Sequence, residues 1–160
     1  MENATLIISS FSLLCSIAAI LFTWMNSKRL KAEAEASLLL RLRSDYESIR
    51  AKMDTRYRDK NWLPDRNDRD IWGPFEEYWF FCYREWLTTR EDRYSQLWNE
   101  NIKIHVKAGL NHRPLRFVLA TIRKEGSLSD EYAKEFINEL IHLHGSDFHQ
   151  EFFPPVETKK

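Results

Sequence analysis

The feature that most constrains this chain is an uncharged, mostly apolar stretch near its N-terminus, ATLIISSFSLLCSIAAILFTWM, at residues 4–25. At about 1.5 Å rise per residue, a helix over this stretch is roughly 33 Å long, which is enough to cross a hydrocarbon core of about 30 Å. The stretch therefore predicts one transmembrane helix, preceded by a short outside N-terminus at residues 1–3.

A cleaved secretory signal is the alternative for this stretch, and its flanks argue against it. The chain starts Met-Glu-Asn without Lys or Arg, and residues 22–25 (FTWM) are bulky where a signal peptidase needs small side chains. Lys28, Arg29 and Lys31 follow at once, and basic residues stay on the cytoplasmic side. We therefore expect an inner-membrane protein whose C-terminal domain is cytoplasmic. Trp24 and these three basic residues then anchor the helix at the lipid headgroups.

Small, mostly hydroxyl-bearing residues recur along this stretch at alternating spacings of 4 and 3. They are Thr5, Ser9, Ser12, Ser16, Ala19, Thr23 and Asn26. In lipid, small side chains let helix backbones approach closely, and hydroxyl groups bond between helices. The stripe predicts a homo-oligomer in which these residues form the interface or line a pore. Since Ser and Thr are common in membrane helices, coincidence is the alternative.

The rest of the chain is predicted to be all-α, because no stretch shows the alternation of a half-buried strand. Neither Pro nor Gly occurs between Asn26 and Lys60, so the first helix is expected to continue into the cytoplasm. An apolar face follows at helical spacing, formed by Leu39, Leu42, Tyr46, Ile49 and Met53. Residues 61–73 (NWLPDRNDRDIWG) are predicted to be a loop.

A second helix is expected from Pro74 to about Arg90, and seven aromatic residues between Phe75 and Trp86 make it the central buried helix. Three more helices are predicted. They run from about Tyr94 to Ala108 with a stop at Gly109, from Pro114 to about Lys124, and from an N-cap at Ser129 to Gly145. Residues 26–145 thus form a cytoplasmic bundle of about five helices, and residues 146–160 an irregular tail.

The side chains give no sign of catalysis, and we expect no enzyme activity, cofactor or metal. Helical ribonucleases often carry an Arg four to six residues before a His, and here the nearest pair is Lys107 and His112, without the planar fork of arginine. His142 and His144 point to different sides of a helix, which is poor for one metal. With a net charge of zero, the chain is not expected to bind nucleic acid directly.

The residues GPFEEYWFFCYREWL (73–87) and LWNENIKIHV (97–106), with the closing helix, resemble a family of small bacterial single-span membrane proteins of unknown function. The layout of one span and a compact helical domain is also similar to the CRISPR-associated membrane protein that forms a ring-shaped pore beside an RNA-guided RNA nuclease. That likeness implies membrane permeabilisation in phage defence, and it carries no site residues over to this chain.

Two functions are therefore expected from the sequence. The first is a single-pass membrane protein that self-associates through its span and forms a pore or perturbs the membrane in antiviral defence. The alternative is a membrane-tethered helical module that binds or scaffolds a cytoplasmic protein partner. In both cases the bilayer is a partner of residues 4–25.

Overall fold

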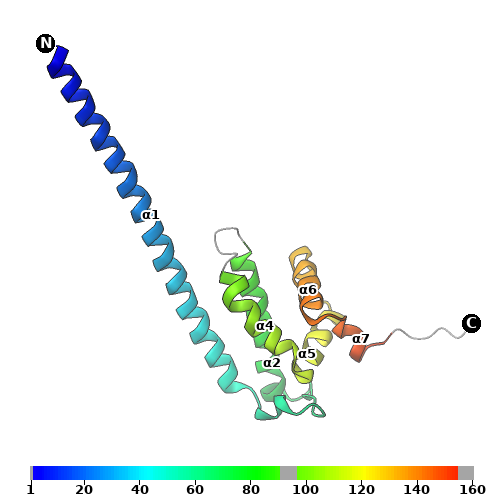
Figure 1. Cartoon of the computed structure of the whole chain (residues 1–160). Coiled ribbons are helices and arrows are strands. Elements are labelled where there is room, and N and C mark those ends of the chain that lie inside the picture. Colours follow the sequence, from blue (N-terminus) through cyan, green and yellow to red (C-terminus); the bar gives the residue numbers. More distant parts are fainter. Residues whose placement is uncertain (1, 91–96, 155–160) are drawn as a thin grey trace, which may run out of the picture. The chain divides into compact units, whose positions relative to one another are not determined.

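The structure, a computed structural model, describes the backbone of residues 2–90 and 97–154 and the side chains of these residues except 2–12 and 101. Every regular element in this part of the chain is helical and none is a strand, so the predicted all-α class is confirmed for it (Figure 1). The contacts divide the chain into two units, residues 1–41 and residues 42–160. Within the described residues, no helix combines the length and the apolarity that crossing a membrane requires.

The first helix, α1 (Glu2–Lys52), runs without interruption from the N-terminal region into the second unit. This confirms that the helix continues past residue 25. In the second unit, Leu42 and Ile49 of α1 are buried and Tyr46 is half-buried. The predicted apolar face therefore packs onto its own unit over the last turns of α1.

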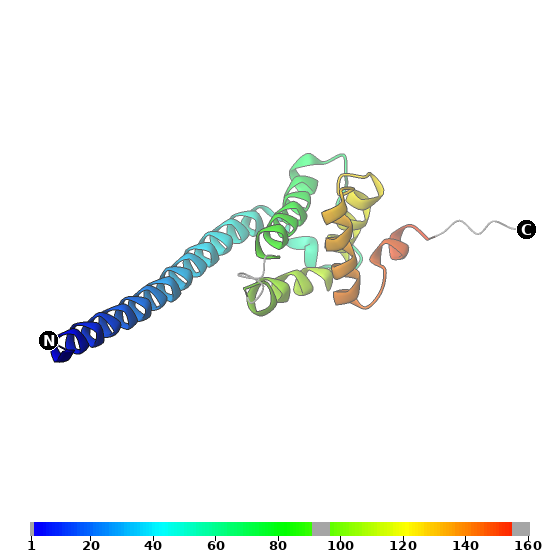
Figure 2. The ribbon, with the colours of Figure 1, turned by 90° about the horizontal axis from the view of Figure 1, so that it is seen from above.

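The other elements follow in the order η1 (Thr55–Arg58), α2 (Arg69–Thr89), η3 (Trp98–Ile102), α4 (Lys103–Leu110), α5 (Arg113–Lys124), α6 (Glu131–His144) and α7 (Phe148–Phe152). Helix α5 packs against α2, α4 and α7, while α6 packs against α2 and α4. Figure 2 shows this second unit from above, with α7 following α6 towards the C-terminus.

Helix α2 is the central buried helix, as predicted. Phe75 and Trp79 have no exposed surface, and Trp72, Tyr78, Phe81, Cys82 and Trp86 are also buried. The buried indole N–H of Trp79 donates a hydrogen bond of 2.7 Å to the carbonyl oxygen of Leu115 at the start of α5. The polar group of this ring is thus satisfied inside the core, where an unpaired N–H would be costly.

The predicted start of α2 at Pro74 was wrong, because the helix already begins at Arg69. The Asp68 carboxylate accepts hydrogen bonds from the backbone N–H groups of Asp70 and Ile71, which caps the helix before the proline. Pro74 consequently lies inside α2 rather than at its first position.

The predicted single helix over residues 94–108 differs from the structure. Residues 94–96 lie outside the described part of the chain. Trp98–Ile102 form a π-helical turn, and α4 continues through Gly109 to Leu110, so Gly109 is not the stop. Glycine is required at position 109 because the Tyr78 side chain lies close to its backbone, and a methyl group there would overlap the Tyr78 hydroxyl.

The C-terminal helices match the prediction in part. Helix α5 begins one residue before the predicted Pro114, and α6 ends at Gly145, whose φ of 82° is the left-handed conformation that favours glycine. The N-cap of α6 is Asp130 rather than Ser129. Its carboxylate accepts hydrogen bonds from the Ala133 N–H and the Tyr83 hydroxyl, which together lower the pKa of Asp130.

The tail beyond Ser146 is not irregular throughout, contrary to the prediction. Asp147 caps the short helix α7, and Phe148 is fully buried. The Glu151 carboxylate accepts two hydrogen bonds from Arg116 of α5, at 2.8 and 3.0 Å. A buried ring and a bidentate ion pair therefore hold α7 to α5. Residues 155–160 lie outside the description.

A single carboxylate of α6 contacts three other elements of the second unit. Glu139 of α6 accepts a hydrogen bond from the Trp86 indole of α2 at 2.7 Å and from the Trp98 indole of η3 at 2.8 Å. Lys103 Nζ of α4 lies 3.9 Å from the same carboxylate. Both partly buried indole N–H groups depend on this one acceptor.

Replacing Glu139 should therefore destabilise the second unit. We expect Glu139→Leu to lower the free energy of unfolding by about 2–3 kcal/mol, because two indole N–H groups lose their acceptor, and Glu139→Gln to cost about 1 kcal/mol, because one oxygen remains. Urea unfolding followed by tryptophan fluorescence measures both values. Glu135→Gln, which removes only an exposed ion pair with Arg90, is the control. Equal stabilities for all three variants would contradict this account.

Candidate functional site

The first unit exposes large apolar side chains over the described part of the predicted span. Eight of them between residues 13 and 25 are 46% to 69% exposed: Leu13, Leu14, Ile17, Ile20, Leu21, Phe22, Trp24 and Met25. At about 100° per residue, they cover more than half of the circumference of the helix. A water-facing surface this apolar is unusual for a soluble monomer and is typical of an interaction surface.

The stripe of small residues lies on the remaining face of the same helix. Ser16, Ala19, Thr23 and Asn26 are exposed there. The Thr23 hydroxyl donates a hydrogen bond of 2.8 Å to the carbonyl oxygen of Ala19 in its own helix. Its proton is therefore used within α1, and only its oxygen is left to accept a bond from another helix. The side chains of Thr5, Ser9 and Ser12 lie outside the described residues.

The predicted membrane-surface residues lie next to one another along α1. Lys28 Nζ lies 3.8 Å from the centre of the Trp24 ring, one turn earlier, which is a cation–π contact. Arg29 and Lys31 form ion pairs with Glu33 and Glu35 at 2.8 and 3.7 Å, each four residues further along the helix. The basic cluster thus carries its own counter-charges, and ion pairs at such solvent-accessible positions contribute little stability.

A cleft in the second unit brings together side chains that the sequence analysis did not connect. Its volume is about 210 Å³. The last turns of α1 contribute to it, together with residues of η1, α2, α4 and α5. The polar and aromatic residues that line it are Tyr46, Arg50, Tyr57, Tyr78, His105 and His112. They come from α1, η1, α2 and α4 and from the turn at His112, so no local motif could have indicated the cleft.

The aromatic rings of the cleft contact each other in two groups. The Tyr46 ring lies 5.5 Å from the His105 ring and 6.3 Å from the Tyr78 ring, while Tyr57 contacts His112 edge-on at 5.0 Å. Burial raises the pKa of the Tyr46 hydroxyl and raises that of Tyr78 well above its usual value. Both hydroxyls therefore stay protonated near neutral pH.

The electrostatic environment of His112 is positive. Burial, followed by the charges of Arg58 and Arg116, lowers the pKa of its imidazole below the usual 6.5. His112 is thus neutral at physiological pH. The charges that act on His112 are those of the neighbouring arginines Arg58 and Arg116.

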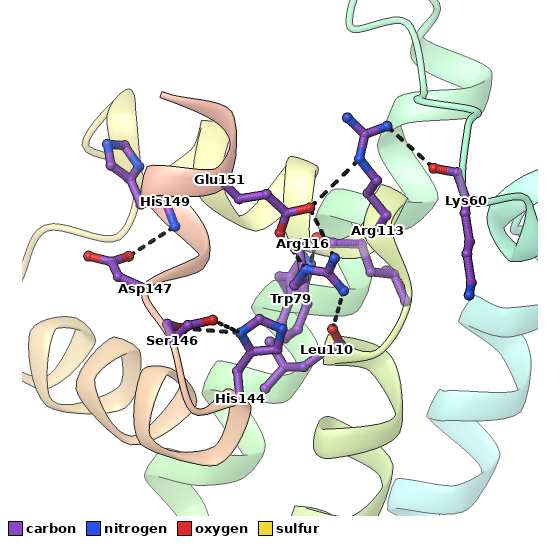
Figure 3. Close-up of polar contacts among 11 residues, drawn as sticks. Lys60, Trp79, Leu110, Arg113, Arg116, His144, Ser146, Asp147, His149 and Glu151 are labelled. Carbon is purple, nitrogen blue, oxygen red and sulfur yellow. Dashed lines mark hydrogen bonds and ion pairs between the residues drawn. The ribbon is translucent and has the colours of Figure 1, made fainter. Parts of the chain in front are cut away.

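The basic residues beside this cleft hold α7 in place. Arg116 donates to the Leu110 carbonyl oxygen at 2.7 Å as well as to Glu151, and Arg113 Nε lies 3.7 Å from Glu151 (Figure 3). Arg113 and Arg116 are therefore both ion-pair partners of Glu151.

The histidines near the C-terminus are not placed to share one ligand. His142 is exposed, and the His144 ring contacts Ser146, whose hydroxyl lies 3.0 Å from Nδ1 (Figure 3). Within the described ranges, no three His, Cys, Asp or Glu residues are placed to hold a metal ion.

No protein-family model matches the chain, and no curated protein or solved structure shows significant similarity to it. The resemblance to the single-span bacterial family and to the ring-forming pore protein stays a prediction.

The contact between Gly109 and Tyr78 can be tested by a double-mutant cycle. Gly109→Ala should lower the free energy of unfolding by about 1–3 kcal/mol, because the methyl group meets the buried Tyr78 ring at its hydroxyl. In a Tyr78→Phe background the loss should be smaller by about 1 kcal/mol, since the clashing oxygen is gone. Gly73→Ala, which meets nothing within 4 Å, is the control and should be neutral or stabilising. Additive effects of the two substitutions would refute the contact.

The lowered pKa of His112 predicts a pH dependence of stability. Below about pH 6.5 the unfolded chain binds a proton at this residue and the folded chain resists it, so stability falls as the pH decreases through the folded-state pKa. Unfolding of the wild type at pH 7.5 and 5.0 should show a larger loss than unfolding of His112→Gln. His142→Gln, at an exposed position, should behave like the wild type. A loss of equal size in the wild type and His112→Gln would exclude this contribution.

Proposed function

We propose that this chain is a single-pass membrane protein in which residues 4–25 of α1 lie in the lipid bilayer and the second unit is a cytoplasmic helical module. The observation that carries the proposal is the exposure of the apolar side chains between residues 13 and 25. Lipid acyl chains would remove this surface from water on all sides of the helix at once, which favours insertion. The proposed span begins at Ala4, before the described side chains.

The residues after the span support the proposed orientation. Lys28 lies over the Trp24 ring, and indole rings and lysine side chains both favour the interface between acyl chains and water. Arg29 and Lys31 add positive charge on the same side of the span. By the positive-inside rule these charges support a cytoplasmic second unit, and the inner membrane is the location that we propose for the chain.

We further propose that the span associates with copies of itself along the small-residue stripe. Large residues cover the opposite arc of the helix, so a second helix can approach closely only at the stripe. The role requires no catalytic residue, cofactor or metal. A pore, and an effect in phage defence, rest on the resemblance in layout alone.

The rival function is a membrane tether, in which α1 only holds the second unit at the membrane. The cleft of the second unit favours it, since clefts are the places where proteins most often bind ligands. A tether would tolerate replacement of residues 4–25 by an unrelated span, whereas self-association along the stripe would be lost.

Insertion is tested by placing a charge in the proposed span of the full-length chain. We expect Leu14→Arg to release the protein from membranes during carbonate extraction, because an arginine near the centre of a span costs about 2.5–3.5 kcal/mol. Leu40→Arg is the matched control, since Leu40 lies on the same helix, is 71% exposed and is outside the span. A wild-type protein in the soluble fraction, or equal behaviour of both variants, would contradict insertion.

Self-association is tested by crosslinking the full-length chain in mild detergent. We expect the double substitution Ser12→Leu and Ser16→Leu to abolish the crosslinked oligomer, because leucine side chains keep the backbones apart. Ala18→Leu makes the same kind of change off the stripe and should leave the oligomer intact. Unchanged crosslinking in the double variant, or a single-subunit wild type, would refute this interface.

A further inference from the structure

The cleft between α1, η1, α2, α4 and α5 is lined by aromatic rings and by the side chain of Arg50. We infer that it binds a small anion that carries one flat ring, such as an aryl phosphate or an aryl carboxylate, with the Arg50 guanidinium as the partner of the charged group. The site lies within the second unit and does not depend on the membrane anchor.

The size of the cleft limits the ligand. At about 210 Å³ it is smaller than the roughly 300–1,000 Å³ of pockets that hold drug-sized ligands. One ring with one charged group fits this space, and a dinucleotide or a lipid tail does not.

The walls of the cleft favour a flat ring. Tyr46, Tyr57 and Tyr78 line it together with the imidazoles of His105 and His112. Aromatic rings gain from offset-stacked and edge-on contacts with another ring, beyond the gain from buried area. Because burial keeps the Tyr46 and Tyr78 hydroxyls protonated, the walls add no negative charge that would repel an anion.

The charge of the cleft favours an anion. Arg50 is exposed, and its guanidinium makes no ion pair or side-chain hydrogen bond with another described residue. A guanidinium pairs with a phosphate or carboxylate through two parallel hydrogen bonds. Among the described residues that line the cleft there is no Asp or Glu, although the charge of Glu47 acts on the Tyr46 hydroxyl. The charges of Arg58 and Arg116 act on His112 at the wall of the cleft. The arginine is therefore available to a ligand rather than committed to the fold.

Arg116 and Arg113 differ from Arg50 in this respect. Both form ion pairs with Glu151, and Arg116 also donates to the Leu110 carbonyl oxygen. They contribute positive potential, but their hydrogen bonds hold α7. This difference makes Arg50 the residue to vary, because its loss should leave the fold intact.

The test uses the full-length chain in detergent and phenyl phosphate as the probe, with detergent alone as the blank. Saturation-transfer NMR should show saturable binding of phenyl phosphate at or below about 5 mM. Benzyl alcohol, which has the ring without the charge, and inorganic phosphate, which has the charge without the ring, should each bind at least about tenfold more weakly.

Two variants assign the binding to this cleft. Arg50→Gln should weaken binding by about tenfold or more, because the charge-assisted hydrogen bonds are lost. Arg43→Gln is the matched control: it lies two turns earlier on the same face of α1 and does not line the cleft. Ala108→Leu, at an exposed lining position, should block the space and abolish binding.

The inference fails if phenyl phosphate does not bind saturably, or if benzyl alcohol binds equally well. It also fails if Arg50→Gln and Arg43→Gln have the same effect, or if Ala108→Leu binds like the wild type. Membrane extraction of the same protein reports separately on the proposed anchor, so the two proposals stand or fall independently.

Discussion

The burial of large apolar side chains is the interaction on which this structure depends, and the two units of the chain differ in it. The second unit buries its aromatic residues inside itself, with Phe75 and Trp79 of α2 fully covered by neighbouring helices. The described side chains of the first unit have no such cover between residues 13 and 25. This difference between the two units is the observation behind the proposed apolar environment of the N-terminal part of α1.

The core of the second unit shows how so many aromatic side chains are accommodated. A tryptophan brings a large apolar ring and one N–H group that needs an acceptor. Trp79 finds it at the Leu115 carbonyl oxygen, and Trp86 and Trp98 share the Glu139 carboxylate. Each hydrogen bond joins two elements, so the polar groups of the rings also define which helices pack together.

Sequence reasoning was reliable where a local signal was decisive. The helix over residues 113–124 and the end of α6 at Gly145 follow from periodicity and from glycine at a position with positive φ. Sequence reasoning was unreliable where tertiary contacts determine the helix boundaries. Gly109 looked like a helix stop, but its role is to leave room for Tyr78. Helix α7 was missed because Phe148 and the Glu151–Arg116 pair stabilise it against α5, and a five-residue helix has no periodicity of its own.

The candidate sites also differ in whether the sequence alone reveals them. The apolar run and the small-residue stripe are readable from consecutive residues, whereas the cleft is formed by side chains from five elements and has no sequence signature. Its arginine, Arg50, is one of many charged residues on the surface and stands out only once the ion pairs of its neighbours are known. The sequence therefore predicted an anchor, and the structure added a cleft formed by residues distant in sequence.

The most direct test of the account is the reactivity of Cys15 in native membranes towards a water-soluble maleimide. Cys15 lies in the proposed span and is exposed on α1, while Cys82 is buried in α2 and burial raises the pKa of its thiol. If lipid surrounds the span, Cys15 is protected in membrane vesicles and reacts only after denaturation, whereas a cysteine introduced by Leu40→Cys reacts at once. Equal labelling rates for Cys15 and Leu40→Cys would show that the helix lies in water and would contradict the central claim.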